Sequence, residues 1–320
     1  MESFVIGIDI GGTMIKGGAF DLRRTCLRKD SIATDAARGQ ECVLQNIQTL
    51  VCRLSGRKAQ PRAIGIGIAG VLDRQRSMLL ESPNLPLLNQ MPLRERLASS
   101  LGIPVFLEND ANCAALGELW CGAGVSFDNF LLFTIGTGIG SGVILNRGLW
   151  TGEEGKAGEF GHMIVNPGGA DCACGKKGCL EAEASGSAMV RNARVALASG
   201  ASSVLTGLCN GDLKLITPEH IYHGACGGDP LCIEILHAAA GFLAVGMANV
   251  NNLLDLHRFI IGGGVSAAFH LVSGWMLSET RRQVFAVSKE KIAIFISQLG
   301  NDAGMYGAGM RALHGIGVQS

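Results

Sequence analysis

The sequence predicts an α/β protein with two similarly built halves, and two observations carry this prediction. An apolar strand, a glycine turn and a second strand open the chain at "FVIGIDIGGTMIKGGAFDL", which begins at Phe4. The same order of elements recurs at "NFLLFTIGTGIGSGVILNRG", which begins at Asn129. Each half therefore opens on one hairpin, and the 320 residues are enough for two ordinary domains with cores of their own.

Composition narrows the class of protein. Lys plus Arg and Asp plus Glu both number 27, so no net charge favours binding to nucleic acid or to an anionic membrane. The most apolar stretch, 236–256, is interrupted by His237 and three asparagines, and we interpret it as a buried helix and not as a membrane span. Eleven cysteines without a signal peptide predict a cytoplasmic protein with mostly free thiols.

The two hairpin turns are candidate phosphate sites. Asp9 ends the first strand, before a Gly-Gly-Thr turn that contains Thr13, and Thr137 lies in the Gly-Thr-Gly turn of the second hairpin. Such turns expose backbone N–H groups, although ordinary tight hairpins share the pattern. The duplication and the two threonines favour phosphate. A third glycine run, "FIIGGGVS", is expected to lead from a strand into a helix near Ser266, which also suits a nucleotide.

Two commoner nucleotide-binding patterns are excluded. Neither hairpin turn carries the GK[ST] of a P-loop. The stretch "GIGIAG", 65–70, matches a dinucleotide fingerprint in its letters, but no clean helical period follows it. We therefore expect a buried strand that ends in a turn.

A carboxylate at another strand end is a candidate proton acceptor. In "IPVFLENDANCAALGELW" a strand leads through Glu108, Asn109 and Asp110 into a helix rich in Ala, Leu and Glu. Asp110 is well placed to cap this helix, and position alone favours the cap. However, strand ends that face a cleft are also where α/β enzymes hold their catalytic groups, so Asp110 could accept a proton from a substrate hydroxyl.

A cysteine cluster predicts a metal site. Cys172, Cys174 and Cys179 follow His162 in the chain, and three thiolates with one imidazole form a closed tetrahedral zinc set. A disulfide is disfavoured by the reducing compartment, and a redox pair is disfavoured because the spacing is not C-x-x-C. The expected zinc is structural. Glu159 and Glu181 flank the cluster, either as solvated charges or as groups held around a polar ligand with several hydroxyls.

Taken together, these motifs resemble the ROK family (repressor, open reading frame, kinase). "GIDIGGTMIKGG", "SPNLP", "LENDANCAALGE", "TIGTGIGSGVILN", "GEFGHM", "CACGKKGCLEAEASG", "FIIGGGVS" and "LGNDAGMYGAG" follow the family's order along nearly the whole chain. The resemblance implies an actin-like ATPase fold, with two domains of mixed sheets around a cleft. It also implies ATP- and Mg²⁺-dependent phosphorylation of a sugar 6-hydroxyl, and a homodimer.

The resemblance assigns roles to individual residues. It implies that Asp110 is the catalytic base. The implied sugar-binding residues are Gly70, Asn84, Asn109, Asp110, Glu159, His162 and Glu181. The implied Mg²⁺- and ATP-binding residues are Asp9, Gly11, Gly12, Thr13, Lys16, Gly136, Thr137, Gly138, Gly263 and Gly264. The zinc ligands it implies are His162, Cys172, Cys174 and Cys179.

The resemblance also implies boundaries and a substrate. The expected domains are 1–118 with a C-terminal helix over about 303–320, and 119–302. "SPNLP" and "CLEAEASG" look most like the glucokinase branch, although N-acetylmannosamine, N-acetylglucosamine, allose or fructose would use nearly the same contacts. Ala69 and Met14 depart from residues common in the family, Pro and Lys, and neither departure removes a proposed catalytic group. A sugar-responsive regulator without enzymatic activity is the alternative that the balanced charge disfavours.

Overall fold

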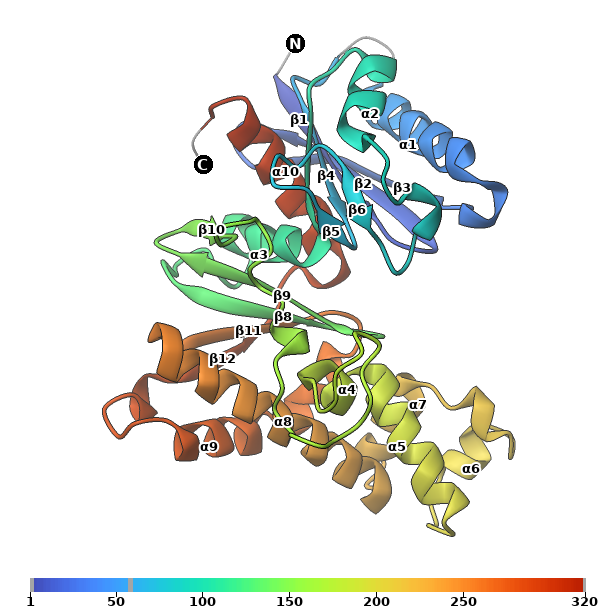
Figure 1. The fold of residues 1–320 in the computed structure, drawn as a ribbon, viewed down its shortest axis with the longest axis vertical. Coiled ribbons are helices and arrows are strands. Elements are labelled where there is room, and N and C mark those ends of the chain that lie inside the picture. Colours follow the sequence, from blue (N-terminus) through green and yellow to red (C-terminus); the bar gives the residue numbers. More distant parts are fainter. Residues whose placement is uncertain (1–2, 57–59, 319–320) are drawn as a thin grey trace. The chain divides into compact units, whose positions relative to one another are not determined.

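The computed structural model describes residues 3–56 and 60–318, and the chain divides into two compact units (Figure 1). The first unit comprises Met1–Asn129, Gly142–Gly158 and Gln298–Ser320, and the second comprises Phe130–Ser141 and Glu159–Ser297. The expected domains, 1–118 with 303–320 and 119–302, stay a prediction, because compactness does not define which residues move together.

The first unit is an α/β layer structure. Its strands are β1 (Phe4–Ile10), β2 (Met14–Asp21), β3 (Cys26–Ala33), β4 (Ile64–Ile68), β5 (Val71–Leu72), β6 (Leu79–Glu81), β7 (Val105–Asn109) and β10 (Gly148–Trp150). Its α-helices are α1 (Gln40–Ser55), α2 (Leu93–Leu101), α3 (Asp110–Cys121) and α10 (Ala303–Gly315), with 3₁₀ turns η1 (Ala36–Arg38), η2 (Pro86–Leu88) and η7 (Gly300–Asp302).

The main sheet of this unit is mixed. The strand order is β3-β2-β1-β4-β7, with antiparallel pairing among the first three and parallel pairing from β1 through β4 to β7. Successive residues of a strand point to opposite faces of a sheet. Leu50 and Leu54 of α1 lie against Gly17, whereas Met305 of α10 lies against Gly18. Helices α1 and α10 therefore cover opposite faces.

Helix α10 packs on its sheet through backbone contacts. A Cβ on Gly7 of β1 or on Gly65 of β4 would overlap the backbone oxygen of Met305 or of Ala308. Gly307 meets α3 in the same way. The glycine content of these strands therefore sets a helix-to-sheet distance that side chains would not permit.

The second unit has a sheet with several helices. Its strands are β8 (Phe130–Ile135), β11 (Arg258–Gly262), β12 (Ala293–Ile296) and the start of β9 (Ile139–Leu145), in the order β9-β8-β11-β12. Its α-helices are α4 (Leu180–Ala184), α5 (Gly186–Ala198), α6 (Leu205–Leu208), α7 (Pro218–Cys226), α8 (Pro230–Leu254) and α9 (Ser273–Gln283). Its 3₁₀ turns are η3 (Phe160–His162), η4 (Leu213–Leu215), η5 (Ser266–Leu271) and η6 (Lys289–Lys291).

Helix α8 explains the most apolar stretch of the sequence. Among the described residues, it is the one helix long and apolar enough to cross a membrane by length and composition alone. In the structure, 61% of its most apolar window is buried, and α4, α5, α7 and α9 contact it. The prediction of a buried helix is confirmed.

Other sequence expectations are confirmed or corrected by the elements. The two hairpins exist as β1–β2 and β8–β9, and "GIGIAG" is strand β4 followed by a turn at Gly70, whose φ is 138°. The C-terminal helix expected over 303–320 ends at Gly315, and residues 319–320 lie outside the described part. The helix expected near Ser266 is divided into η5 and α9.

We predict that Gly65→Ala lowers the free energy of unfolding by about 3 kcal/mol, because the added methyl group meets backbone and not a movable side chain. Gly274→Ala in α9 is the matched control, since within the described part of the chain no heavy atom beyond its chain neighbours and the nearby backbone of its own helix lies within 4 Å of its ideal Cβ. Alanine should stabilise that helix by up to ~1 kcal/mol. Urea unfolding followed by circular dichroism measures both, and equal stability of the two variants would contradict the prediction.

Candidate functional site

In the first unit, the predicted polar residues gather at one edge of the sheet. Strands β1, β4 and β7 are parallel and in register, with Ile10 opposite Ile68 and Ile68 opposite Asn109. The carboxyl ends of these strands therefore lie side by side. Asp9, the loop at Gly70 and the Asn109–Asp110 pair are brought to this single edge, which is where open α/β sheets bind ligands.

Asp9 lies between the sheet and the first turn of α10. An ideal Cβ on Gly304 would be 2.7 Å from the Asp9 carboxyl group, so this close approach requires glycine. Burial, followed by repulsion from the Asp110 carboxylate, raises the pKa of Asp9 to about 7, and Lys16 opposes part of that rise. Lys16 is the register partner of Asp9 on β2 and donates from Nζ to the Asn301 carbonyl at 3.2 Å.

The Asn109–Asp110 pair corrects one expectation. The residue that caps α3 is Asn109, whose Oδ1 accepts from the backbone N–H groups of Ala111 at 2.9 Å and Asn112 at 3.1 Å. Asp110 is already the first helical residue, so it does not occupy the N-cap position. Burial raises the pKa of Asp110, while hydrogen bonds from the Ala111 backbone and the Asn109 side chain lower it. The capping explanation for Asp110 is therefore wrong.

Two loops frame this carboxylate pair. The turn at 11–13 is fixed by Thr34, which donates from Oγ1 to the Gly11 carbonyl at 2.7 Å and from its N–H to the Thr13 carbonyl at 2.8 Å. Gly12 lies beside Asn84, with 3.6 Å between its ideal Cβ and the Asn84 Cβ. The Gly70 carbonyl accepts from Asn109 Nδ2 at 3.2 Å.

In the second unit, the Gly136–Thr137–Gly138 turn is closed by its own backbone. The Gly136 N–H donates to the Gly138 carbonyl at 2.9 Å, and the Gly186 N–H at the start of α5 donates to the Gly136 carbonyl at 2.8 Å. The carboxylate of Glu181 accepts from the Ile139 N–H at 2.9 Å and lies against Gly138. Glu181 is thus bonded to the glycine turn and is not a fully solvated charge.

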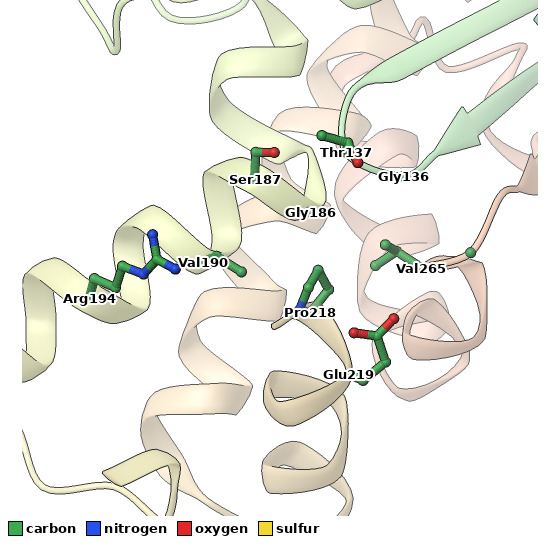
Figure 2. A pocket seen from close by; sticks show the side chains of 10 residues that line it. Gly136, Thr137, Gly186, Ser187, Val190, Arg194, Pro218, Glu219 and Val265 are labelled. Carbon is green, nitrogen blue, oxygen red and sulfur yellow. The ribbon is translucent and has the colours of Figure 1, made fainter. Parts of the chain in front are cut away.

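This turn forms one wall of a cavity of about 480 Å³. Its lining residues are Gly136, Thr137, Gly186, Ser187, Val190, Arg194, Pro218, Glu219, Gly264 and Val265. Figure 2 shows Arg194 at one end and Glu219 with Val265 at the other, with Val190 and Pro218 between them. Three of the predicted nucleotide residues, Gly136, Thr137 and Gly264, are among its lining residues.

The other two predicted glycines of the second unit, Gly138 and Gly263, are not among the residues that line the cavity. Gly263 has a φ of 88°, and a Cβ there would overlap the backbone of Ile135. Gly138 meets the Glu181 carboxylate. Both therefore shape the turns without lining the cavity.

Sequence reasoning missed the helical wall of this cavity. Arg194 of α5 donates from Nε to the Leu213 carbonyl at 2.8 Å and from Nη2 to the Lys214 carbonyl at 2.7 Å, so its guanidinium plane is fixed. Pro218 and Glu219 begin α7. The one available signal was capping, since Ser185 caps α5 and Thr217 caps α7, which directs two helix N-termini toward this region.

The four predicted zinc ligands come together. The ligand atoms of His162, Cys172, Cys174 and Cys179 all lie within 4.8 Å of one another. His162 Nδ1 is 3.7 Å from Cys172 Sγ, and Cys174 Sγ is 3.6 Å from Cys179 Sγ. A tetrahedral zinc ion places two sulfurs about 3.8 Å apart and a sulfur and a nitrogen about 3.6 Å apart. The donor set fits zinc.

The thiols differ in their electrostatic environments. Burial raises the pKa of Cys179 to about 12 and also raises that of Cys172. A hydrogen bond from the Lys176 backbone lowers the pKa of the exposed Cys174 thiol. Zinc binding must therefore release protons from at least two thiols, so the affinity for zinc should increase with pH.

The polar residues around this cluster are only partly brought together. Glu159 is exposed and precedes η3, and its carbonyl accepts from the His162 N–H at 3.0 Å. Glu181 is the second residue of α4, two residues after Cys179, and is bonded to the glycine turn. The Cys/His cluster and the glycine turn are thus connected through the short segment 179–181.

Comparison with known proteins gives one consistent result. The chain matches the ROK family over residues 5–314. It is 36% identical over 308 residues to a glucokinase of Streptomyces coelicolor and 34% identical over 304 residues to a glucokinase of Thermotoga maritima, with 95% of each chain covered in both cases. A crystal structure of a ROK family glucokinase from Streptomyces griseus, in complex with glucose and AMPPNP, superposes with a TM-score of 0.84 at 36% identity. That superposition covers 98% of this chain and 100% of the other.

We predict that Asp9→Asn stabilises the protein at alkaline pH in the absence of Mg²⁺. A raised folded-state pKa means that the protonated Asp9 favours the fold, and this contribution is lost as pH rises from the ordinary pKa of 3.8 to about 7. Asn109 and Asp110 are left intact by the change. Because Asp9 is partly exposed, we expect a gain of about 1–2 kcal/mol at pH 8 and less than half of that gain at pH 5. Thermal unfolding across pH 5–8.5 measures it.

The matched control for this prediction is the exposed Asp128→Asn, which should leave the pH profile of the melting temperature unchanged. Mg²⁺ should raise the melting temperature of the wild type and not that of Asp9→Asn. Parallel pH profiles for wild type and Asp9→Asn would contradict the prediction, because they would show that ionisation of Asp9 does not lower the free energy of unfolding.

Another prediction concerns the Cys/His cluster. Cys174→Ser removes one of four ligands and should lower zinc affinity by at least about 10-fold, with a lower melting temperature. Cys52→Ser on α1 is the control, because that thiol is exposed and lies outside the cluster. Elemental analysis of the purified proteins gives zinc per chain. Full zinc content in Cys174→Ser would remove this cysteine from the ligand set.

Proposed function

The chain belongs to the ROK family and has its actin-like ATPase fold, and we propose that it is an enzyme that transfers the γ-phosphoryl group of ATP to the 6-hydroxyl of glucose. The observation that carries the proposal is the half-buried pair Asp9 and Asp110 at the carboxyl edge of three parallel strands. Similarity to glucokinases along almost the whole chain supports the choice of reaction.

Asp110 is the proposed general base. Its carboxylate is not needed as a helix cap, since Asn109 serves that role, and its raised pKa strengthens it as a proton acceptor. Asn109 spans from the cap to the Gly70 carbonyl, so it can place a sugar hydroxyl next to Asp110. Asn84 and the backbone at Gly70 complete the proposed sugar contacts in the first unit.

ATP and Mg²⁺ are the proposed cofactors. Asp9 and the backbone of the turn 11–13 would hold the metal and phosphates, with Lys16 beside them. Mg²⁺, when bound, neutralises charge that develops on the transferring phosphoryl group. In the second unit, the cavity of about 480 Å³ is large enough for a nucleoside, and the Gly136–Thr137–Gly138 turn supplies N–H groups for phosphate.

Zinc is the proposed structural metal, bound by His162, Cys172, Cys174 and Cys179. Its four ligands would leave no open position for water, and the ion would fix His162, with Glu159 and Glu181 as the proposed neighbouring contacts of sugar hydroxyls. We also propose a cytoplasmic homodimer. Eleven free cysteines support a reducing compartment, and light scattering of the purified protein tests the dimer.

An assay of coupled ADP release with Mg-ATP tests the function. The panel is glucose, N-acetylglucosamine, N-acetylmannosamine, mannose, fructose and allose. We expect the highest kcat/KM with glucose. Preference for another hexose would keep the mechanism and replace the substrate. Absence of turnover with every sugar, in folded zinc-loaded protein, would favour a regulator, and specific DNA binding in a gel-shift assay would then identify it.

Asp110→Asn separates the base from the fold in the same assay. The substitution keeps the shape of the side chain and leaves the Asn109 cap intact. We expect turnover to fall by about 10²–10⁴-fold while glucose binding, measured by calorimetry, changes little. An equal loss of binding would mean that Asp110 holds the sugar and does not act as the base.

A further inference from the structure

A buried carboxylate next to the proposed base is not explained by the roles assigned so far. Glu108 is the penultimate residue of β7, directly before Asn109 and Asp110, and is only 3% exposed. A buried charge is costly unless it is paired and hydrogen-bonded. Its partners therefore indicate what the charge is for.

Three segments of the chain place nitrogen donor groups around the Glu108 carboxylate. Arg76 donates from Nε to Oε2 at 2.7 Å, and Arg311 Nε of α10 lies 3.8 Å from the same oxygen. The other oxygen, Oε1, accepts from the Asn109 N–H at 3.1 Å and from Asn112 Nδ2 at 3.0 Å. One carboxylate thus links the start of α3, the C-terminal helix and the loop that contains Arg76.

The loop that contains Arg76 connects two of the proposed sugar-binding residues, Gly70 and Asn84. Arg76 lies in the turn between β5 and β6, the hairpin that runs from Gly70 toward Asn84. Its φ of 48° is unusual for a non-glycine residue. The Asp73 carboxylate holds the turn, accepting from the Ser77 N–H at 2.6 Å and from its hydroxyl at 2.7 Å.

Two bonds therefore join this hairpin to the base segment. One is the Glu108–Arg76 pair at the tip of the hairpin, and the other is the bond from Asn109 Nδ2 to the Gly70 carbonyl at its base. A single bond would act as a pivot, whereas two separated bonds fix orientation as well as distance. Misplacement of a reacting group by about 1 Å costs on the order of 10²-fold in rate.

Fold stability alone does not account for such a pair. Replacing a buried ion pair by apolar residues of similar volume is often neutral or stabilising. We propose that Glu108 and Arg76 are positioning residues, which hold Asn109 and Asp110 in one geometry relative to the Gly70–Asn84 hairpin and so align the sugar 6-hydroxyl with its base. This inference rests on the proposed glucose kinase function and adds two residues to it.

Arg76→Ala tests the proposal, with Arg74→Ala as the matched control. Arg74 lies in the same turn, but its pair with Glu154 spans 3.7 Å and is exposed, so its loss should change nothing. We expect Arg76→Ala to lower kcat/KM for glucose by about 10–100-fold and to leave KM for ATP within about twofold. Arg76→Lys should be intermediate, because it keeps the charge and loses the planar fork, and it serves if Arg76→Ala does not fold.

Glu108→Gln completes a double-mutant cycle. If both residues act through their bond, the double variant Glu108→Gln with Arg76→Ala should be no slower than the slower single variant. Fully additive losses, or kinetics of Arg76→Ala and Arg76→Lys equal to those of Arg74→Ala, would overturn the proposal.

Amide hydrogen exchange distinguishes failure of the proposal from failure of the proposed function, because it needs no turnover. Amides of 70–84 and 109–112 should exchange at least about 10-fold faster in Arg76→Ala than in Arg74→Ala, while α1 stays unchanged. If the wild type phosphorylates no sugar, this exchange pattern still supports or overturns the coupling. Unchanged exchange in both segments would overturn it even in an active enzyme.

Discussion

The proximity of two like charges, Asp9 and Asp110, is the constraint on which the first unit depends. Parallel pairing of β1, β4 and β7 brings them to one edge, and burial with mutual repulsion raises the pKa of Asp9 to about 7. Such an arrangement is unfavourable for an isolated fold and favourable for binding a cation. The bonds of Thr34 to the neighbouring turn and of Asn109 to Gly70 preserve it by holding backbone in place.

In the second unit, the candidate phosphate site is formed mainly by backbone groups. The turn 136–138 has no long side chain, and its geometry is held by the Gly186 N–H and by the Glu181 carboxylate. Because Cys179 lies two residues before Glu181, a metal that fixes the cysteine also limits the motion of that carboxylate. A structural ion and a phosphate-binding turn would thus share one short segment of chain.

The sequence predicted the parts of the site that depend on local signals. Both glycine hairpins, the turn at Gly70 and the clustering of Cys172, Cys174 and Cys179 with His162 follow from residue type and spacing. The cap of α3 was assigned to the wrong neighbour, since Asn and Asp are equally good caps and only backbone geometry separates them. Arg76 and Glu108 are 32 residues apart in the sequence. Their pairing depends on tertiary packing, so no local sequence pattern predicts it.

The backbone packing of α10 has a consequence for synthesis of the protein. Gly7 and Gly65, which are made before the second unit, contact Met305 and Ala308, which are made after the whole of that unit. The face of the first sheet that α10 covers therefore stays exposed in the nascent chain until the second unit has been translated. Residues 303–315 thus make the order of folding opposite to the order of synthesis, so the unit begun first is the last to be finished.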